Sequence, residues 1–443
     1  MRRGGSRVGV GTWLGGVVLG VVWLAVAVLG IETVAGARAG GLDMIAAVGT
    51  RDGKALLDQA RRAERGGAFG QADRFYRSAW SDLSTRAIAA RELRRMHRRS
   101  GFRRAVDEEQ VGEIERILGP SFVRTETDHF VILSDADRGW TRERARLLER
   151  TALQFRRVME RISYPMVPPE KKLLCVFFEK HEMYRGFASV QDGVEASWIA
   201  GYYTGLANRA VFYDDRTGPS FLTAYSRLDG HQETVEQTRA QVISLRRQKD
   251  MDGARNLSEQ ADNLERELKR ERARLLEEVR ESSESKAIHE ATHLLAFNCG
   301  VQSRTREYPF WLTEGLASSF ETSNPNAAFG PDRPTEYRES EFVRASHVGL
   351  IPLEEFVGMT TVPENDGDLA DVLYAQAYSL FAYLYRYERQ ALGAYLQDVW
   401  TQDTGVRSTE SHRELFVKHF GRIGALEHRW KTRSKRLMAM ADD

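Results

Sequence analysis

The sequence predicts an α+β protein whose main domain, over residues 112–443, joins a mixed sheet subdomain to a helical subdomain. Between about 120 and 215, short apolar runs typical of strands stand beside an amphipathic helical stretch. From 371 to 440 the spacing of apolar residues is helical throughout. Two further helical segments are expected, a hairpin over 44–108 and a charged insert over 226–284 within the main domain.

The first 37 residues (1–37) predict a signal peptide or a membrane anchor. Three arginines begin the chain, residues 8–31 are almost wholly apolar and uncharged, and Ala35-Gly36-Ala37 forms a small-x-small cleavage site. Because roughly 20 apolar residues can also span a bilayer uncleaved, the anchor stays open as the alternative. In both cases we expect the rest of the chain to be extracytoplasmic, secreted or periplasmic, with membrane contact only through the N-terminal segment if it is uncleaved.

Composition is that of an ordinary globular protein. Hydrophobic residues make up 42% of the chain, charged residues 29%, and the formal net charge is +1. This balance lacks the basic character of a nucleic-acid-binding domain, so we expect no nucleic acid partner. The two cysteines, Cys175 and Cys299, lie beside apolar residues, and we expect buried side chains rather than a disulfide or a nucleophile.

The segment 44–108 has the spacing of one tetratricopeptide-like (TPR-like) helix pair. The residues that carry this spacing are Ala60, Gly67, Phe69, Ala72, Phe75, Tyr76 and Ala79. Since about three such repeats are needed to bury a continuous core, a single pair predicts a helical hairpin packed on the main domain. A peptide-docking module is the alternative.

The sheet subdomain is predicted from runs of apolar residues. Strands are expected at 130–133, 173–178, 199–203 and 209–213, with an amphipathic helix at 141–160. We expect one edge strand of this sheet to remain open.

The insert 226–284 keeps a heptad-like apolar spacing that is interrupted around Gly253. This pattern predicts an antiparallel, coiled-coil-like helical hairpin that runs into a helix over 286–297. A spacer or a lid is the simplest role for it, and self-association through the coil is the second.

The most informative motif is His289-Glu290-Ala291-Thr292-His293, which lies in the run of good helix formers over 286–297 and ahead of Gly300, a residue suited to end a helix. Histidines at i and i+4 share one helix face and can converge on one zinc ion, while Glu290 can reach a zinc-activated water. A third ligand is expected from Glu314, which follows Pro309 inside an apolar helical stripe and would need a cation there.

These two segments, HEATH and WLTEGLASSFE, resemble the gluzincin branch of the zinc metallopeptidases, whose signature is HExxH followed by a glutamate in a W-L-x-E-G-x-A helix. The resemblance implies a zincin-like catalytic domain that binds Zn²⁺. It implies His289, His293 and Glu314 as zinc ligands and Glu290 as the general base. From about residue 120 onward the chain also resembles a group of secreted bacterial proteins of unknown function within this superfamily.

The resemblance extends to two outer residues. Glu321, seven positions after Glu314, matches a glutamate of the M1-type aminopeptidases that orients a ligand histidine. Tyr374 aligns with the tyrosine that steadies the oxyanion in those enzymes, and Tyr378, one turn along, is the alternative.

Three departures from the motifs of related zinc peptidases narrow the range of activities that we expect. Cys299 stands where metzincins place their third histidine, and Ser318 stands where thermolysin-like enzymes place an acidic residue. The G-x-M-E-N strand that holds a free substrate amine in aminopeptidases is absent from the sequence. The candidate substrate edge strand, Gly201-Tyr202-Tyr203, offers backbone hydrogen bonds to an extended peptide but no carboxylate for an amine, so an endopeptidase is favoured.

The sequence therefore predicts an extracytoplasmic zinc metallopeptidase acting on a peptide or protein substrate. The alternative is a non-catalytic binding or scaffold protein on a peptidase-like fold, which would use its TPR-like and coiled-coil helices. Residues 322–348, beyond the predicted helix of Glu314 and Glu321, are expected to form a loop.

Overall fold

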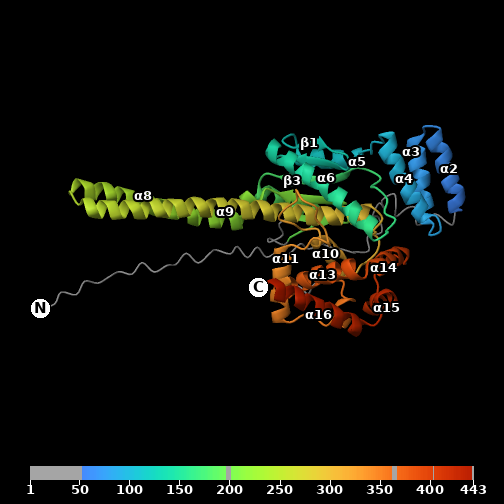
Figure 1. Ribbon diagram of the computed structural model, residues 1–443. Helices are drawn as coiled ribbons and strands as arrows, with labels where there is room; N and C mark the ends of the chain where they lie inside the picture. Colours follow the sequence, from blue (N-terminus) through green and yellow to red (C-terminus); the bar gives the residue numbers. More distant parts are fainter. Residues whose placement is uncertain (1–51, 196–200, 362–366, 403, 442–443) are drawn as a thin grey trace.

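The computed structural model describes residues 52–195, 201–361, 367–402 and 404–441 (Figure 1). It confirms the α+β prediction, since a five-stranded mixed sheet stands beside a larger set of helices. The predicted signal peptide or anchor, 1–37, lies outside the described residues. Within the described ranges, the helices lack a stretch both long and apolar enough to cross a membrane.

The sheet has the order β1-β2-β3-β5-β4. Its strands are β1 (Val123–Glu126), β2 (Phe130–Ser134), β3 (Leu173–Phe178), β4 (Gly201–Thr204) and β5 (Arg209–Tyr213). The three central strands β2, β3 and β5 are parallel, and the two outer strands pair antiparallel with their neighbours. The central strands are buried along their whole length, which explains why they read as continuous apolar runs in the sequence.

Helices cover both faces of the sheet. One face packs against α6 (Arg138–Arg161) and the C-terminal part of α9 (Met251–Asn298), through alternate side chains such as Ile132 and Cys175. The other face, with Val131 and Leu174, packs against α5 (Glu108–Leu118) and α7 (His181–Asp192). Neither β1 nor α7 is predicted from the sequence, and the predicted domain start at 112 falls inside α5.

The N-terminal segment folds into three helices. They are α2 (Gly53–Arg65), α3 (Phe69–Ser81) and α4 (Arg86–Ser100). The expected pair corresponds to α2 and α3, and α4 packs on α3 as a third member. Trp80 ties the group to the main domain, because its Nε1 donates to the carbonyl of Pro165 at 2.5 Å and its ring meets Trp400 edge-on.

A long two-helix arm projects from the body (Figure 1). It consists of α8 (Pro219–Arg247) and the N-terminal part of α9. The whole of α9 has 48 residues and is about 70 Å long. The residues buried along the contact between the helices repeat every seven positions, at Val235 and Val242 on α8 and at Ala254, Ala261, Leu268 and Leu275 on α9. The second helix of the predicted insert is therefore continuous with the segment that carries the HEATH motif, and both belong to α9.

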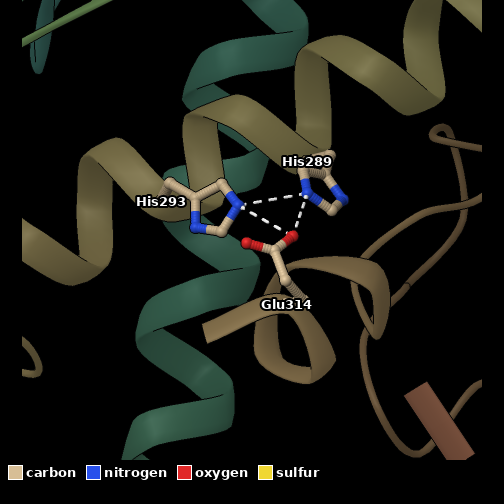
Figure 2. Close-up of side chains that lie close together, drawn as sticks. All are labelled: His289, His293 and Glu314. Atoms are coloured by element: carbon tan, nitrogen blue, oxygen red, sulfur yellow. Dashed lines mark hydrogen bonds and ion pairs between the residues drawn. The ribbon is translucent and has the colours of Figure 1, made fainter. Parts of the chain in front are cut away.

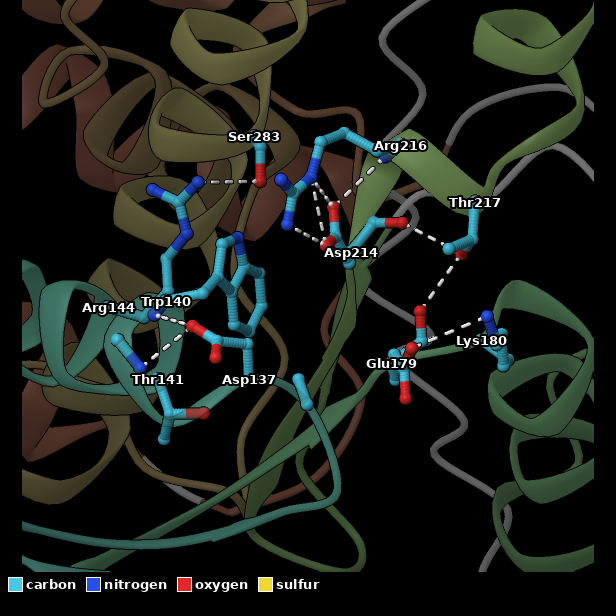
Figure 3. Close-up of polar contacts among 12 residues, drawn as sticks. Asp137, Trp140, Thr141, Arg144, Glu179, Lys180, Asp214, Arg216, Thr217 and Ser283 are labelled. Carbon is cyan, nitrogen blue, oxygen red and sulfur yellow. Dashed lines mark hydrogen bonds and ion pairs between the residues drawn. The ribbon is translucent and has the colours of Figure 1, made fainter.

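Polar contacts fix the arm where it enters the body (Figure 3). Arg144 of α6 donates to Ser283 Oγ of α9 at 3.1 Å, and its guanidinium lies over the ring of Trp140. Thr217, in the short helix η1 (Asp215–Thr217) before α8, donates through Oγ1 to the carbonyl of Glu179 at 3.0 Å. The base of the arm is thus held to α6 and to the end of β3.

The remaining helices form the second half of the main domain. They are α10 (Phe310–Ser318), α11 (Glu336–Val348), α12 (Leu353–Phe356), α13 (Gly367–Tyr387), α14 (Arg389–Thr401), α15 (Thr409–Phe420) and α16 (Ile423–Ala441). The expectation of a loop over 322–348 is wrong for its second part, because α11 is a helix. Thr335 caps it by accepting from the backbone N–H of Arg338 at 3.4 Å, and Phe342 and Ala345 bury its inner face.

Candidate metal centre

Two helices meet to form a buried cluster of two histidines and a glutamate. The C-terminal part of α9 is buried from Lys286 to Phe297, with the sheet on one side and the C-terminal helices on the other. Helix α10 packs across it and contributes Glu314. Gly315 allows α10 and α13 to approach closely, because a Cβ at this position would lie 2.4 Å from the carbonyl oxygen of Ala377 on α13. That glycine brings α13 against the helix that carries Glu314.

The side chains of His289, His293 and Glu314 point toward one another (Figure 2). The Nε2 atoms of the two histidines are 3.1 Å apart, and Glu314 Oε2 lies 3.2 Å from the first and 3.5 Å from the second. All three residues are at most 2% exposed. The candidate ligand atoms lie within 4.8 Å of one another, a cluster that could hold a metal ion.

Glu321 determines which nitrogen of His289 faces the cluster. Its Oε1 lies 2.7 Å from His289 Nδ1. Burial acts to raise the pKa of Glu321, but Arg338 and His289 outweigh it and hold that pKa below its usual range. Glu321 is therefore an ionised acceptor, and the Nδ1 nitrogen carries the proton. The Nε2 lone pair of a neutral His289 then points at His293 and Glu314.

Arg338 supports this arrangement from outside. Its guanidinium donates to both carboxylate oxygens of Glu321, at 2.7 and 2.6 Å, and to Glu341 at 2.6 Å. Arg338 is 2% exposed. Its role is not predicted from the sequence, because it lies in the segment expected to be a loop. The signal that could have revealed it is Thr335, a helix-capping residue followed by Glu336 and Glu339 in the first turn.

Glu290 lies beside the cluster and differs from the other carboxylates. It is 2% exposed, and its Oε2 has no hydrogen-bond partner in the described part of the chain. Burial raises its pKa to about 7 against the opposing effect of His289 and His293, and a hydrogen bond from the backbone of Tyr203 also lowers it. A carboxylate with a pKa near neutrality and a free oxygen is suited to take up and release a proton.

The two tyrosines considered for the oxyanion role occupy different surroundings. After burial itself, the groups that raise the pKa of Tyr374 are the carboxylates of Glu314, Glu290 and Glu321, so this side chain lies near the cluster. Burial also raises the pKa of Tyr378, but the strongest neighbouring groups there are Glu339 and Arg386 rather than the carboxylates of the cluster. The structure therefore brings Tyr374 to the site and places Tyr378 toward α11.

The expected substrate edge strand is β4, which ends the sheet beside α9. The ring of Tyr203 stacks against His293 with centroids 6.5 Å apart, and Tyr202 points to the other face, where its hydroxyl donates to Asp192. Gly201, Tyr202 and Tyr203 are all buried. Strand β4 is thus an edge in strand order but is covered, and its pairing with a peptide stays a prediction.

The cluster has the chemistry of a cation site. Two imidazole nitrogens and a carboxylate oxygen, all acceptors, converge in a dry environment where acceptors alone would repel one another. Without a bound metal a proton must take the place of the cation. Burial lowers the pKa of His289, but hydrogen bonds to Glu314 and Glu321 outweigh this effect and raise it to about 10. A divalent metal would satisfy the same acceptors, and the residues present fit it.

Part of the chain is similar to a known protein family. The profile of a family described as "Protein of unknown function (DUF1570)" matches residues 283–403. No curated protein and no solved structure matches the chain. The matched segment contains the three candidate ligands together with Glu290, Glu321, Arg338 and Tyr374. The part of this chain that is similar to that family of unknown function is therefore the part that builds the candidate metal centre.

Proposed function

We propose that the protein is a zinc metallopeptidase of the gluzincin type that works outside the cytoplasm. The observation that carries the proposal is the convergence of His289 Nε2, His293 Nε2 and Glu314 Oε2 beside Glu290, whose Oε2 lacks a partner among the described residues. A protein that uses a metal only for structure has no need of such an additional carboxylate.

Zinc is the metal that this donor set favours. Two imidazole nitrogens and one carboxylate oxygen are a common catalytic zinc set, and such sites keep a fourth position open. Magnesium and calcium prefer sites made of oxygen ligands alone. The contact from Glu321 to His289 Nδ1 is also the support that ligating histidines usually receive.

The residues then divide the chemistry of peptide hydrolysis among them. Bound zinc would supply a Lewis acid that makes water acidic and polarises the scissile carbonyl. Glu290 takes the proton from the attacking water and delivers it to the leaving amine. The hydroxyl of Tyr374 donates to the oxygen on which negative charge develops. Glu321 and Arg338 keep His289 in the tautomer and orientation that the site requires.

An endopeptidase is favoured over an aminopeptidase. Strand β4, with Tyr203 against His293, is the element along which an extended peptide would run past the cluster. Because the site is buried, a substrate reaches it only after the elements that cover it move apart. We infer that opening is a step of the catalytic cycle.

The test is cleavage of a peptide library by the zinc-loaded protein, read by mass spectrometry, with every peptide present in free and N-acetylated form. We expect internal cleavage of both forms by the wild type and loss of most turnover in Glu290→Gln. Cleavage that requires a free amine would contradict the endopeptidase assignment. Products that appear equally with Glu290→Gln would remove Glu290 from the mechanism. No cleavage of any peptide by a zinc-loaded wild type would favour a scaffold that engages partners through the α8–α9 arm.

A further inference from the structure

A cavity lies on the far side of α9 from the candidate metal centre. It has a volume of about 950 Å³ and is bounded by α4, α6, the turn between β1 and β2, and the segment around Pro168 and Pro169. Leu295 of α9 and Cys299, the residue that follows this helix, form part of its lining. Leu295 comes two positions after His293, roughly 200° around the helix. The cavity is therefore separate from the metal centre, and a ligand bound in it does not depend on the proposed function.

The lining of this cavity is rich in arginine. Five arginines belong to it, namely Arg94, Arg98, Arg103, Arg104 and Arg156. In the ranges that the structure describes, no ion pair holds Arg98, Arg103, Arg104 or Arg156. Arg94 donates to the carbonyl of Met166, and its nearest carboxylate is distant, with Glu160 Oε1 3.8 Å from its Nε.

The acidic residues of the lining do not neutralise this charge. Glu126 already contacts Lys172 at 2.9 Å, and Glu149 contacts the ring of His129 at 2.7 Å. Asp128, the third acidic residue of the lining, forms no ion pair with these arginines in the described part of the chain. Arg104 reaches no carboxylate in the described part of the chain and instead donates to the carbonyls of Pro169, at 3.2 Å, and Asp128, at 3.1 Å. Burial lowers the pKa of Arg104, and the nearby charges of Glu149 and Asp128 oppose this effect without outweighing it. An excess of positive charge therefore surrounds the cavity.

The size and lining of the cavity define the class of ligand further. Ligand sites for small organic molecules have volumes of about 300–1,000 Å³, so this cavity exceeds what one inorganic ion needs. Part of its lining is apolar and includes Phe155, Met166 and Leu295. Guanidinium groups bind carboxylates and phosphates with two parallel hydrogen bonds. We propose that this arginine-lined cavity binds a small organic anion carrying at least two carboxylate or phosphate groups.

The experiment is isothermal titration calorimetry on the full chain at constant ionic strength. Citrate and fructose 1,6-bisphosphate are the two probes, with glucose as the neutral control and sulfate as the simple anion. Binding of citrate alone identifies a carboxylate ligand, and binding of the bisphosphate alone a phosphate ligand. We expect one site per chain for at least one of the two, with sulfate at least about tenfold weaker because it bears a single anionic group.

Variants decide whether the binding is at this cavity. Arg98→Ala and Arg156→Ala should each weaken binding by about tenfold or more, and Arg156→Lys should recover part of the loss. Arg91, exposed on the same helix α4 but outside the lining, provides the matched control Arg91→Ala, which should bind as the wild type does. The proposal is overturned if neither probe binds at millimolar concentration, if sulfate binds as tightly as the probes, or if the Arg98 and Arg156 variants bind like Arg91→Ala.

Discussion

Replacing Arg338 by methionine should damage both stability and metal binding. The change removes a guanidinium that is 2% exposed and contacts the carboxylates of Glu321 and Glu341. Breaking a buried ion pair from one side costs about 3–5 kcal/mol, and Arg338 serves two carboxylates, so we expect a loss near the upper end of that range. The pKa of Glu321 would rise, since Arg338 is the largest of the groups that oppose the effect of burial.

The effect on the metal arises from the tautomer of His289. A protonated Glu321 donates to Nδ1 instead of accepting from it, which places the imidazole proton on Nε2, the atom that faces the cluster. We expect zinc affinity to fall about 10–100-fold, the usual effect of losing such a supporting contact, or roughly 1.4–2.8 kcal/mol.

Two measurements check this prediction. Urea unfolding of the metal-free protein gives the change in stability, and competition with a chromophoric chelator gives zinc affinity at a temperature where the variant is folded. Arg344→Met, on the exposed side of the same helix α11, is the matched control. Glu321→Gln tests the contact between Glu321 and His289 directly and should also weaken zinc binding. The reasoning is refuted if Arg338→Met unfolds like Arg344→Met and binds zinc within about threefold of the wild type.

Protonation, close packing and the oxyanion group give further predictions for the site. Zinc must displace the proton that His289 holds up to a pKa of about 10. The apparent association constant of zinc should therefore rise about tenfold per pH unit between about pH 6 and 8. A chelator competition that shows the same zinc affinity across this range would contradict the prediction. Because the pKa of His289 is higher in the folded protein than in the unfolded chain, its protonation stabilises the metal-free protein fully below about pH 6.5. This contribution should be lost as pH rises toward 10, and urea unfolding across that range measures it. Gly315→Ala should lower the free energy of unfolding by about 1–3 kcal/mol, because the new Cβ would meet the backbone of α13. The control Gly112→Ala, at a position with open space around it, should not destabilise the protein, and thermal unfolding measures both variants. Tyr374→Phe should lower kcat on a cleaved peptide by about 10²–10³ with zinc binding unchanged, while Tyr378→Phe should retain activity; equal losses would contradict the placement of the two rings.

The parts of the site that can be predicted from the sequence are those encoded by short-range spacing. His289 and His293 are four residues apart, and helix geometry alone places them on one face. Glu314 is predicted because a carboxylate within an apolar stripe needs a partner, and the structure places its Oε2 3.2 Å from His289 Nε2. Glu321, contacting Nδ1 of the same histidine, is predicted only through the family resemblance.

Contacts between residues far apart in the sequence cannot be predicted from spacing in the same way. Arg338 contacts Glu321 seventeen positions earlier in the sequence, and the intervening stretch contains three prolines, two asparagines and a glycine, which favours a loop throughout. The burial of β4 likewise depends on how the ring of Tyr203 packs against α9. The arginine-lined cavity likewise brings together residues from α4, α6 and the segment around Pro168, which lie far apart in the sequence.

Zinc content of the purified protein tests the central claim most directly, by elemental analysis of the wild type, Glu290→Gln and His293→Ala after zinc is supplied and excess removed. We predict about one zinc per chain in the wild type and in Glu290→Gln, because Glu290 is not one of the three converging ligands, and loss of zinc in His293→Ala. A folded wild type that retains no zinc, or a His293→Ala variant that retains as much as the wild type, would contradict the account.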